Sequence, residues 1–198
     1  GSGRPGPVWI DLPLDVQGAK IEEKDLKGFI PPRPRGGAKK VNAYAARAAE
    51  LLERSKRPVI LAGNGIRIAG AEGEFLALAK KLGVPVLTTW RAADLMSETD
   101  PLYFGRPGSI ASRGANFVQQ NSDFIMTLGA RLDLPQVGHN YGSFARGAKK
   151  VVVDIDPREI AKLDMRVDVK AACGAKEFIA EFSRAAKRPS VTATLLYS

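Results

Sequence analysis

The sequence contains a single cysteine, Cys173, and a single histidine, His139, among 198 residues. One cysteine cannot close a disulfide within the chain, and one Cys with one His cannot build the clusters that hold structural zinc. No apolar run reaches the length of about 18 residues that is typical of a membrane helix. The first residues also lack the pattern of a signal peptide. We therefore expect a cytoplasmic protein with no membrane partner and no metal site of its own.

Aromatic residues are also scarce, at 7% of the chain, whereas Lys and Arg outnumber Asp and Glu by 30 to 21 and give a formal net charge of +9. Nucleic-acid binding requires such cations to gather on one face. Here they occur as scattered singles and pairs, such as Lys80-Lys81, and we expect no nucleic-acid partner. Hydrophobic residues make up 44% of the chain, which is typical of a folded globular protein and excludes a disordered one.

Short apolar runs alternate with segments of helical spacing over most of the chain. Strands are predicted at residues 58–62, 84–88, 123–128, 150–155 and 167–169. Helices are predicted at residues 41–55, 70–82, 109–121 and 174–186, with a short one from Pro157, with Ser109 and Asp156 as N-caps and Gly83 as a C-cap. Buried strands between amphipathic helices predict an α/β fold: a doubly wound, mainly parallel sheet of five to six strands with helices on both faces.

The two ends of the chain lie outside this alternation. Residues 7–12 form an isolated apolar run that predicts a buried strand, and the following residues are rich in Pro and Gly. We assign residues 1–17 to a segment carrying that strand, 18–37 to a linker, 38–187 to the main domain and 188–198 to a flexible end.

Ligands of a doubly wound sheet bind at the carboxyl ends of the strands, where loops and helix N-termini expose backbone N–H groups. Two glycine turns follow strands of this domain, at residues 63–65 and 129–133, and polar or basic residues follow the others, at 88–91, 105–109 and 154–156. Together they describe a slot for an extended nucleotide, with arginines for phosphate and carboxylates for ribose. Each turn alone also fits a tight connection without a ligand, because Ile68 stands where the dinucleotide fingerprint has its third glycine.

No side chain in the sequence pairs a nucleophile with a base, so we predict no catalytic residue in this chain. The absence of such a pair favours a binding or structural role for the domain.

Several motifs resemble the acetolactate synthase-like enzymes that use thiamine diphosphate. They are residues 3–17 (GRPGPVWIDLPLDVQ), 57–65 (RPVILAGNG), 83–86 (GVPV), 129–133 (GARLD) and 152–157 (VVDIDP). The resemblance covers the end of the family's pyrimidine-binding domain and all of its Rossmann-like central domain. It implies that residues 1–17 are the last strand of a missing domain, and that the chain is an inactive fragment of a homo-oligomeric parent whose thiamine diphosphate and Mg²⁺ sites lie on other domains.

The resemblance further implies that the central domain binds FAD, ADP or neither. The positions that match the family's flavin contacts are Arg4, Gly63, Asn64, Gly65, Thr89, Trp90, Arg91, Phe104, Gly105, Arg106, Pro107, Gly108, Gly129, Arg131, Asp133, Asp154, Ile155, Asp168 and Val169. At Asn64, Arg106-Pro107, Leu134-Pro135 and Val167 the chain departs from the flavin-binding pattern. Arg106 adds a cation there, which indicates a different anionic ligand or an interdomain contact.

Two hypotheses about function stay open. The first is that the parent decarboxylates a 2-keto acid and transfers the two-carbon unit, while this domain serves assembly and nucleotide binding. The second is a freestanding or degenerate nucleotide-binding or structural domain without catalysis.

Overall fold

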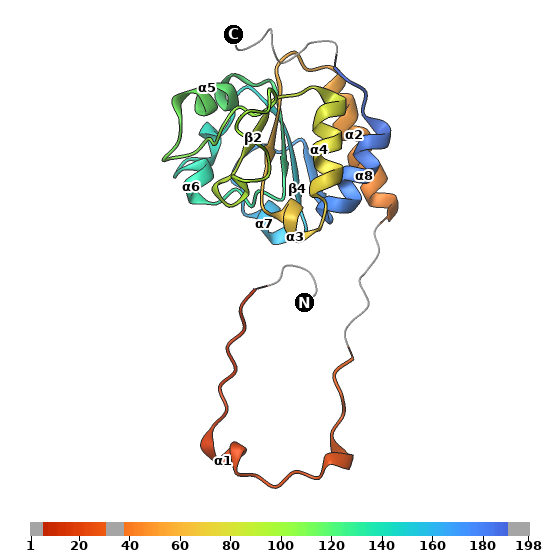
Figure 1. Cartoon of the computed structure of the whole chain (residues 1–198), viewed down its shortest axis with the longest axis vertical. Coiled ribbons are helices and arrows are strands. Elements are labelled where there is room, and N and C mark those ends of the chain that lie inside the picture. The colour runs from red at the N-terminus through yellow and green to blue at the C-terminus, as the bar shows by residue number, and fades with distance from the viewer. Residues whose placement is uncertain (1–5, 31–37, 190–198) are drawn as a thin grey trace. The chain divides into compact units, whose positions relative to one another are not determined.

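The computed structural model describes residues 6–30 and 38–189 (Figure 1). The chain divides into two units, residues 1–36 and 37–198, and each is described by itself. Within the described residues, no helix combines the length and the hydropathy needed to cross a bilayer.

The described part of the first unit contains two short helical turns, α1 (Leu14–Gln17) and η1 (Glu23–Asp25). The segment at residues 7–12, where the sequence predicts a strand of a missing domain, is irregular in this structure, with Trp9 91% and Ile10 76% exposed. An apolar run becomes a strand only when a neighbouring strand accepts its backbone hydrogen bonds. Residues 6–30 contain no such neighbour.

The second unit is built on a five-stranded sheet in the order β2-β1-β3-β4-β5, with every pairing parallel. The strands are β1 (Pro58–Ala62), β2 (Val86–Thr88), β3 (Phe124–Leu128), β4 (Lys149–Asp154) and β5 (Val169–Ala172). Every residue of β1, β2 and β3 is buried, as expected of a parallel sheet covered on both faces. The predicted doubly wound fold is therefore confirmed.

Helices cover both faces of the sheet, and successive strand residues point to opposite faces. The long helices α2 (Ala38–Glu53), α4 (Glu72–Leu82) and α8 (Ala175–Ala185) lie on one side in Figure 1, and α5 (Arg113–Asn121) and α6 (Leu134–Val137) lie on the other. The first core layer lies between the sheet and α2, α4 and α8, and the second lies between the sheet and α5 and α6. Ile60 packs with Phe178 in the first core layer, whereas Val59 and Leu61 pack with Val118 in the second. The layer under α8 also holds a stacked pair, Phe178 and Phe182, whose ring centroids are 5.6 Å apart.

Two of the three predicted helix caps are confirmed, and the third differs. The side chain of Asp156 accepts a 2.9 Å hydrogen bond from the Arg158 N–H and begins α7 (Pro157–Ala161), and Gly83 ends α4 with φ +63°. Helix α5 begins at residue 113 and not at the predicted Ser109, with Ser112 as N-cap: the Ser112 Oγ accepts a hydrogen bond from the Ala115 N–H.

The remaining differences lie at strand and loop positions. A short helix, α3 (Gly65–Ile68), precedes α4, and two 3-10 turns, η2 (Trp90–Ala92) and η3 (Tyr141–Ser143), lie in loops. The last strand covers residues 169–172 instead of the predicted 167–169. Most of the predicted flexible end, residues 190–198, lies outside the described residues.

Candidate functional site at the carboxyl edge of the sheet

The two glycine turns that follow β1 and β3 touch each other at the carboxyl edge of the sheet. The Gly65 N–H donates to Gly129 O at 3.0 Å. A Cβ atom on Gly63 would lie 2.2 Å from Gly129 O and 2.3 Å from the Ala130 Cα, and one on Gly65 would lie 2.7 Å from the Gly129 Cα. These glycines are therefore required for two backbones to approach, with or without a ligand.

The turn after β3 continues through left-handed backbone that positions Arg131. Gly129, Arg131 and Leu132 have φ values of +56°, +61° and +52°. A non-glycine residue in this conformation costs free energy and persists only where its surroundings hold it. Leu132 is buried in the second core layer, and the Arg131 Nε lies 3.3 Å from Glu159 of α7. These contacts hold a guanidinium beside the ends of β3 and β4.

The carboxylates after β4 are occupied by local backbone. Asp154 is buried and accepts a 2.9 Å hydrogen bond from the Asp156 N–H, while Asp156 caps α7. Ile155 between them is 48% exposed. Asp133 precedes α6 without capping it through its side chain, and is exposed. The ribose contacts expected of Asp154 therefore compete with a hydrogen bond that the turn already makes.

One basic residue at this edge was missed from the sequence. Arg67 on α3 lies 3.1 Å from Asp94 and 3.6 Å from Glu72, and its Nη1 donates to Asn64 Oδ1 at 3.5 Å. These contacts tie the turn after β1 to the loop after β2. Its place two residues after the Gly63-Asn64-Gly65 turn was the signal that would have found it.

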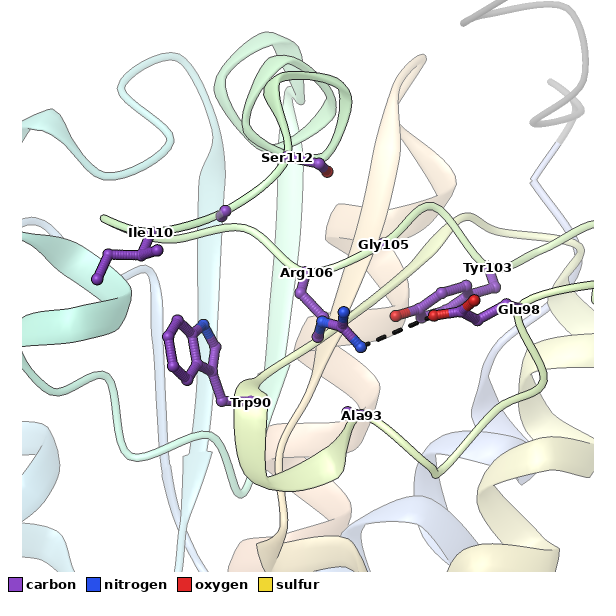
Figure 2. A pocket seen from close by; sticks show the side chains of 9 residues that line it. Trp90, Ala93, Glu98, Tyr103, Gly105, Arg106, Ile110 and Ser112 are labelled. Carbon is purple, nitrogen blue, oxygen red and sulfur yellow. Dashed lines mark ion pairs between the residues drawn. The ribbon is translucent and has the colours of Figure 1, made fainter.

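An open cavity of about 670 Å³ lies beyond β2, where the sequence places Thr89 to Arg91 and residues 104–108 (Figure 2). Its lining residues are Trp90, Ala93, Glu98, Tyr103, Gly105, Arg106, Ile110, Ala111 and Ser112. Thr89 is fixed beside β1, because its N–H donates to Ala62 O at 2.9 Å, and Arg91 is exposed.

Hydrogen bonds and close backbone contacts hold residues 105–108, which form one side of this cavity. The Gly108 N–H donates to Asn116 Oδ1 and its carbonyl accepts from Asn116 Nδ2, at 2.9 and 3.0 Å. Gly105 and Gly108 have φ values of +95° and +144°, and a Cβ on Gly108 would lie 2.6 Å from Pro135 O. Gln136 is buried and its Nε2 donates to Pro107 O. The segment that carries Arg106 is therefore held in a defined conformation.

Asp168 lies at the opposite edge of the sheet. The register pairs Val151 with Val169, so Asp168 stands beside the amino end of β4, where it accepts a 3.0 Å hydrogen bond from the Lys150 N–H. Burial alone would raise the pKa of Asp168, but the Lys150 amide and the charges of Lys149 and Arg166 outweigh it and lower that pKa. Asp168 fixes the start of β5, and neither it nor the adjacent Val169 shares an edge with the glycine turns.

The carboxyl end of β5 is instead occupied by Cys173 and Gly174, ahead of α8. The Cys173 N–H donates to Asp154 O at 3.0 Å, which joins the ends of β4 and β5. Burial and the nearby charge of Glu177 raise the pKa of the Cys173 thiol to about 12, so this thiol is neutral and a poor nucleophile. In the sequence, Gly174, which precedes the last helix, was the signal that could have placed Cys173 at the carboxyl edge of the sheet.

Two further expectations concern Arg4 and metal ions. Arg4 lies outside the described residues. Among residues 6–30 and 38–189, no group of three or more His, Cys, Asp or Glu side chains is placed to hold a metal ion. The carboxyl edge thus offers backbone turns and guanidinium groups, and the guanidinium groups suit anion binding.

Comparisons with known proteins identify relatives of this domain. Residues 45–182 match the family described as "Thiamine pyrophosphate enzyme, central domain". The chain is 38% identical over 186 residues to a probable acetolactate synthase large subunit of Methanocaldococcus jannaschii, which covers 90% of this chain and 30% of that protein. It is 34% identical over 194 residues to the acetolactate synthase large subunit of Corynebacterium glutamicum, covering 94% of this chain and 29% of that protein.

A solved structure, benzoylformate decarboxylase from Polynucleobacter necessarius, superimposes with a TM-score of 0.62 at 22% identity. The match covers 89% of this chain and 32% of that one, and at this identity it shows the fold alone. The chain spans about 30% of the length of the curated relatives described above.

Proposed function

Because the chain belongs to the family of thiamine pyrophosphate enzyme central domains, we propose that it serves as the central domain of a larger, homo-oligomeric acetolactate synthase-like enzyme. Thiamine diphosphate supplies the carbanion chemistry by which such an enzyme decarboxylates a 2-keto acid and transfers the remaining two-carbon unit. Support comes from the acetolactate synthase relatives, which match 90% or more of this chain at identities of 34% and 38%.

Residues 6–30 and 38–189 do not provide the Mg²⁺ ligands that accompany thiamine diphosphate. Mg²⁺ takes oxygen ligands in octahedral geometry, and no cluster of acidic side chains in the described residues provides them. We therefore assign that site to other parts of the parent, and we expect this chain to be catalytically inactive by itself.

The proposed task of this domain, besides assembly, is to bind FAD or ADP along the carboxyl edge of the sheet. The observation that carries this proposal is the Arg131 guanidinium, which the left-handed turn after β3 and the contact with Glu159 hold at this edge. The N–H groups of Gly63, Gly65 and Gly129 donate to protein carbonyls, so Arg131 is the group at these turns that suits a diphosphate. An ADP moiety, common to both candidate ligands, is the minimal group to test.

The competing function is that of a structural domain with a degenerate slot. The space that a side chain at Gly63 would take is filled by Ala130, and Asp154 and Asp156 accept local backbone hydrogen bonds. These contacts stabilise the turns without any ligand, so this alternative predicts no nucleotide binding at all.

Calorimetric titration of the 198-residue chain with ADP, FAD and thiamine diphosphate, each alone, tests the proposal. We expect micromolar binding of ADP or FAD and none of thiamine diphosphate. The Arg131→Met variant should bind at least about 10-fold more weakly, because a charge-assisted hydrogen bond to phosphate is lost. Arg184→Met is the matched control, since Arg184 also pairs with a glutamate but lies on α8. Failure of both nucleotides to bind would leave the structural role as the answer.

A further inference from the structure

Two basic pairs that are far apart in the sequence lie together at the amino edge of the sheet. Helix α4 carries Lys80 and Lys81 in its last turn and ends shortly before β2 begins, so this turn lies at the amino edge. Lys187 and Arg188 follow the end of α8. All four side chains are exposed, and we call these four residues the basic edge.

Direct contacts join the two helix ends that carry these residues. Helix α8 packs against α4. The Lys81 Nζ donates a hydrogen bond to Ser183 O in the last turn of α8. A Cβ added to Gly83, the residue that ends α4, would lie 3.0 Å from the Arg188 Nη2, so the Arg188 guanidinium lies against the end of α4. The four cations therefore belong to one continuous surface.

Protein carboxylates do not neutralise the basic edge. In the described parts of the chain, no carboxylate forms an ion pair with any of its four residues. Glu181, one turn before the end of α8, is held by Arg184 at 2.5 Å. Residues 190–198 contain no Asp or Glu, and residues 1–36 contain more Lys and Arg than Asp and Glu. Neither end of this chain thus supplies an acidic run to cover the surface.

Helix dipoles account for only part of this charge. The carboxyl end of a helix carries about −0.5 of an elementary charge, which favours a nearby cation. The ends of α4 and α8 together offset about one positive charge by this effect, whereas the basic edge carries four. The surplus gathers like charges in one place, and such a potential attracts an anionic partner.

We propose that the basic edge docks a separate protein through an acidic segment of that protein, whose Asp or Glu carboxylates pair with the four cations. Arg188 can accept such a carboxylate in a bidentate pair. No aromatic side chain is exposed on α4 or α8, and single-stranded nucleic acids bind largely by stacking their bases on aromatic rings. The surface therefore favours a polypeptide. This inference is independent of the nucleotide-binding proposal, because the glycine turns lie at the opposite edge of the sheet.

Fluorescence anisotropy of a labelled acidic peptide tests this surface. The probe is a fluorescein-labelled peptide of about 12 residues that alternates Glu and Ser, and its control has Gln in place of each Glu. We expect the 198-residue chain to bind the Glu peptide at least about 10-fold more tightly than the Gln peptide, because several exposed ion pairs add together. This difference should disappear as NaCl is raised to about 0.5 M, since exposed charges are then screened.

Two variants of equal charge locate the binding surface. The basic-edge variant combines Lys80→Gln, Lys81→Gln, Lys187→Gln and Arg188→Gln, and should bind the Glu peptide at least about 10-fold more weakly. The control variant removes four exposed cations of other elements, by Lys40→Gln, Arg113→Gln, Arg158→Gln and Lys170→Gln. It has the same net charge, and it should bind within about 3-fold of the wild type because only the long-range attraction falls.

A third variant separates docking from a role in helix stability. Replacing Lys80, Lys81 and Lys187 by Arg keeps every charge, so it should keep peptide binding. Circular dichroism and urea unfolding check that all three variants are folded. If the basic-edge variant lost unfolding free energy but kept its affinity for the Glu peptide, the cations would serve the helix ends alone and the inference would be overturned.

The remaining outcomes are equally decisive. Equal weakening in the basic-edge and control variants would show attraction to the whole basic chain and overturn the inference. An oligonucleotide of about 12 nucleotides that binds more tightly than the Glu peptide, and depends on the basic edge, would assign the surface to nucleic acid instead. Self-association that is lost in the basic-edge variant, measured by sedimentation, would assign it to a second copy of this chain. ADP binding should be the same in the basic-edge variant and the wild type, so the nucleotide-binding proposal stands or falls separately.

Discussion

The substitution Gly63→Ala tests how tightly the two glycine turns, at residues 63–65 and 129–133, are packed against each other. In Gly63→Ala the new Cβ would lie 2.2 Å from Gly129 O, 2.3 Å from the Ala130 Cα and 2.6 Å from the Ala130 N. All three atoms belong to backbone, so no side chain can rotate away. The substitution therefore forces the turns after β1 and β3 apart, at the edge where these two central strands end.

The loss of unfolding free energy in Gly63→Ala can be estimated from substitutions that overpack other protein interiors. Overpacking a well-packed site costs typically about 1–3 kcal/mol, and the rigid backbone neighbours place Gly63→Ala at about 3 kcal/mol or more. A domain of 150 to 250 residues loses about 2–4 °C of Tm for each kcal/mol, which predicts a fall of about 6–12 °C. Urea unfolding followed by far-ultraviolet circular dichroism measures the free energy directly.

Gly73→Ala is the matched control. Gly73 lies in α4, where an added Cβ meets nothing within 4 Å. The same chemical change there should raise the free energy of unfolding by about 0.5–1 kcal/mol, because alanine favours a helix over glycine. If Gly63→Ala left the unfolding free energy within about 0.5 kcal/mol of the wild type, the packing argument for the turns would be refuted.

Three further predictions concern other parts of the domain. Asp168→Asn should lower the free energy of unfolding by about 1–2 kcal/mol at pH 7, because a charge-assisted hydrogen bond is lost. The pKa of Asp168 is lowered in the folded state, so the difference in stability between wild type and variant is present above the unfolded-state pKa of about 3.9. In acid unfolding curves this difference should vanish as the pH falls through the folded-state pKa. A constant difference down to pH 2 would contradict it. The Cys173 thiol, whose pKa is raised to about 12, should react with iodoacetamide at pH 8 at least about 100-fold more slowly in the folded chain than in urea. Equal reaction rates in the folded and the urea-unfolded chain, measured by a thiol assay, would show that the folded-state thiol is ionised. Phe178→Ala should cost about 3–5 kcal/mol because Phe178, on α8, is fully buried, whereas Phe117→Ala, at a 61% exposed site, should change the unfolding free energy by less than about 0.5 kcal/mol. Similar losses in both variants would refute the assigned core.

The sheet was predictable from the sequence because its strands are buried on both faces. Residues 58–62 and 123–128 are predominantly apolar, and the structure places β1 and β3 there. The caps at Gly83 and Asp156 were predictable because each depends on a residue with a specific local preference. Strand order was not predicted, because pairing depends on contacts between residues far apart in the chain.

The positions at which the structure differs from the sequence pattern depend on tertiary partners. Residues 7–12 carry a strand-like pattern, but residues 6–30 offer no strand to pair with. Ser109 and Ser112 are both suitable N-caps by residue type, so the sequence does not distinguish them, and in the structure the Ser112 side chain caps α5.

The candidate site was predictable at its turns and not at its last strand. A shift of two residues in β5 moves Asp168 from the expected carboxyl end to the amino end of the sheet. Arg67 and the close approach of Gly63 to Gly129 depend on three-dimensional neighbours that no local pattern encodes.

The most direct test of the proposed nucleotide site is an NMR titration of the isotope-labelled chain with ADP, read at assigned backbone amides. We predict shift changes centred on residues 63–65 and 129–131, with the amides of Lys150 and Asp168 unchanged because they lie at the opposite edge of the sheet. Changes centred on Lys150 and Asp168, or no changes at millimolar ADP, would contradict the claim that the carboxyl edge binds nucleotide.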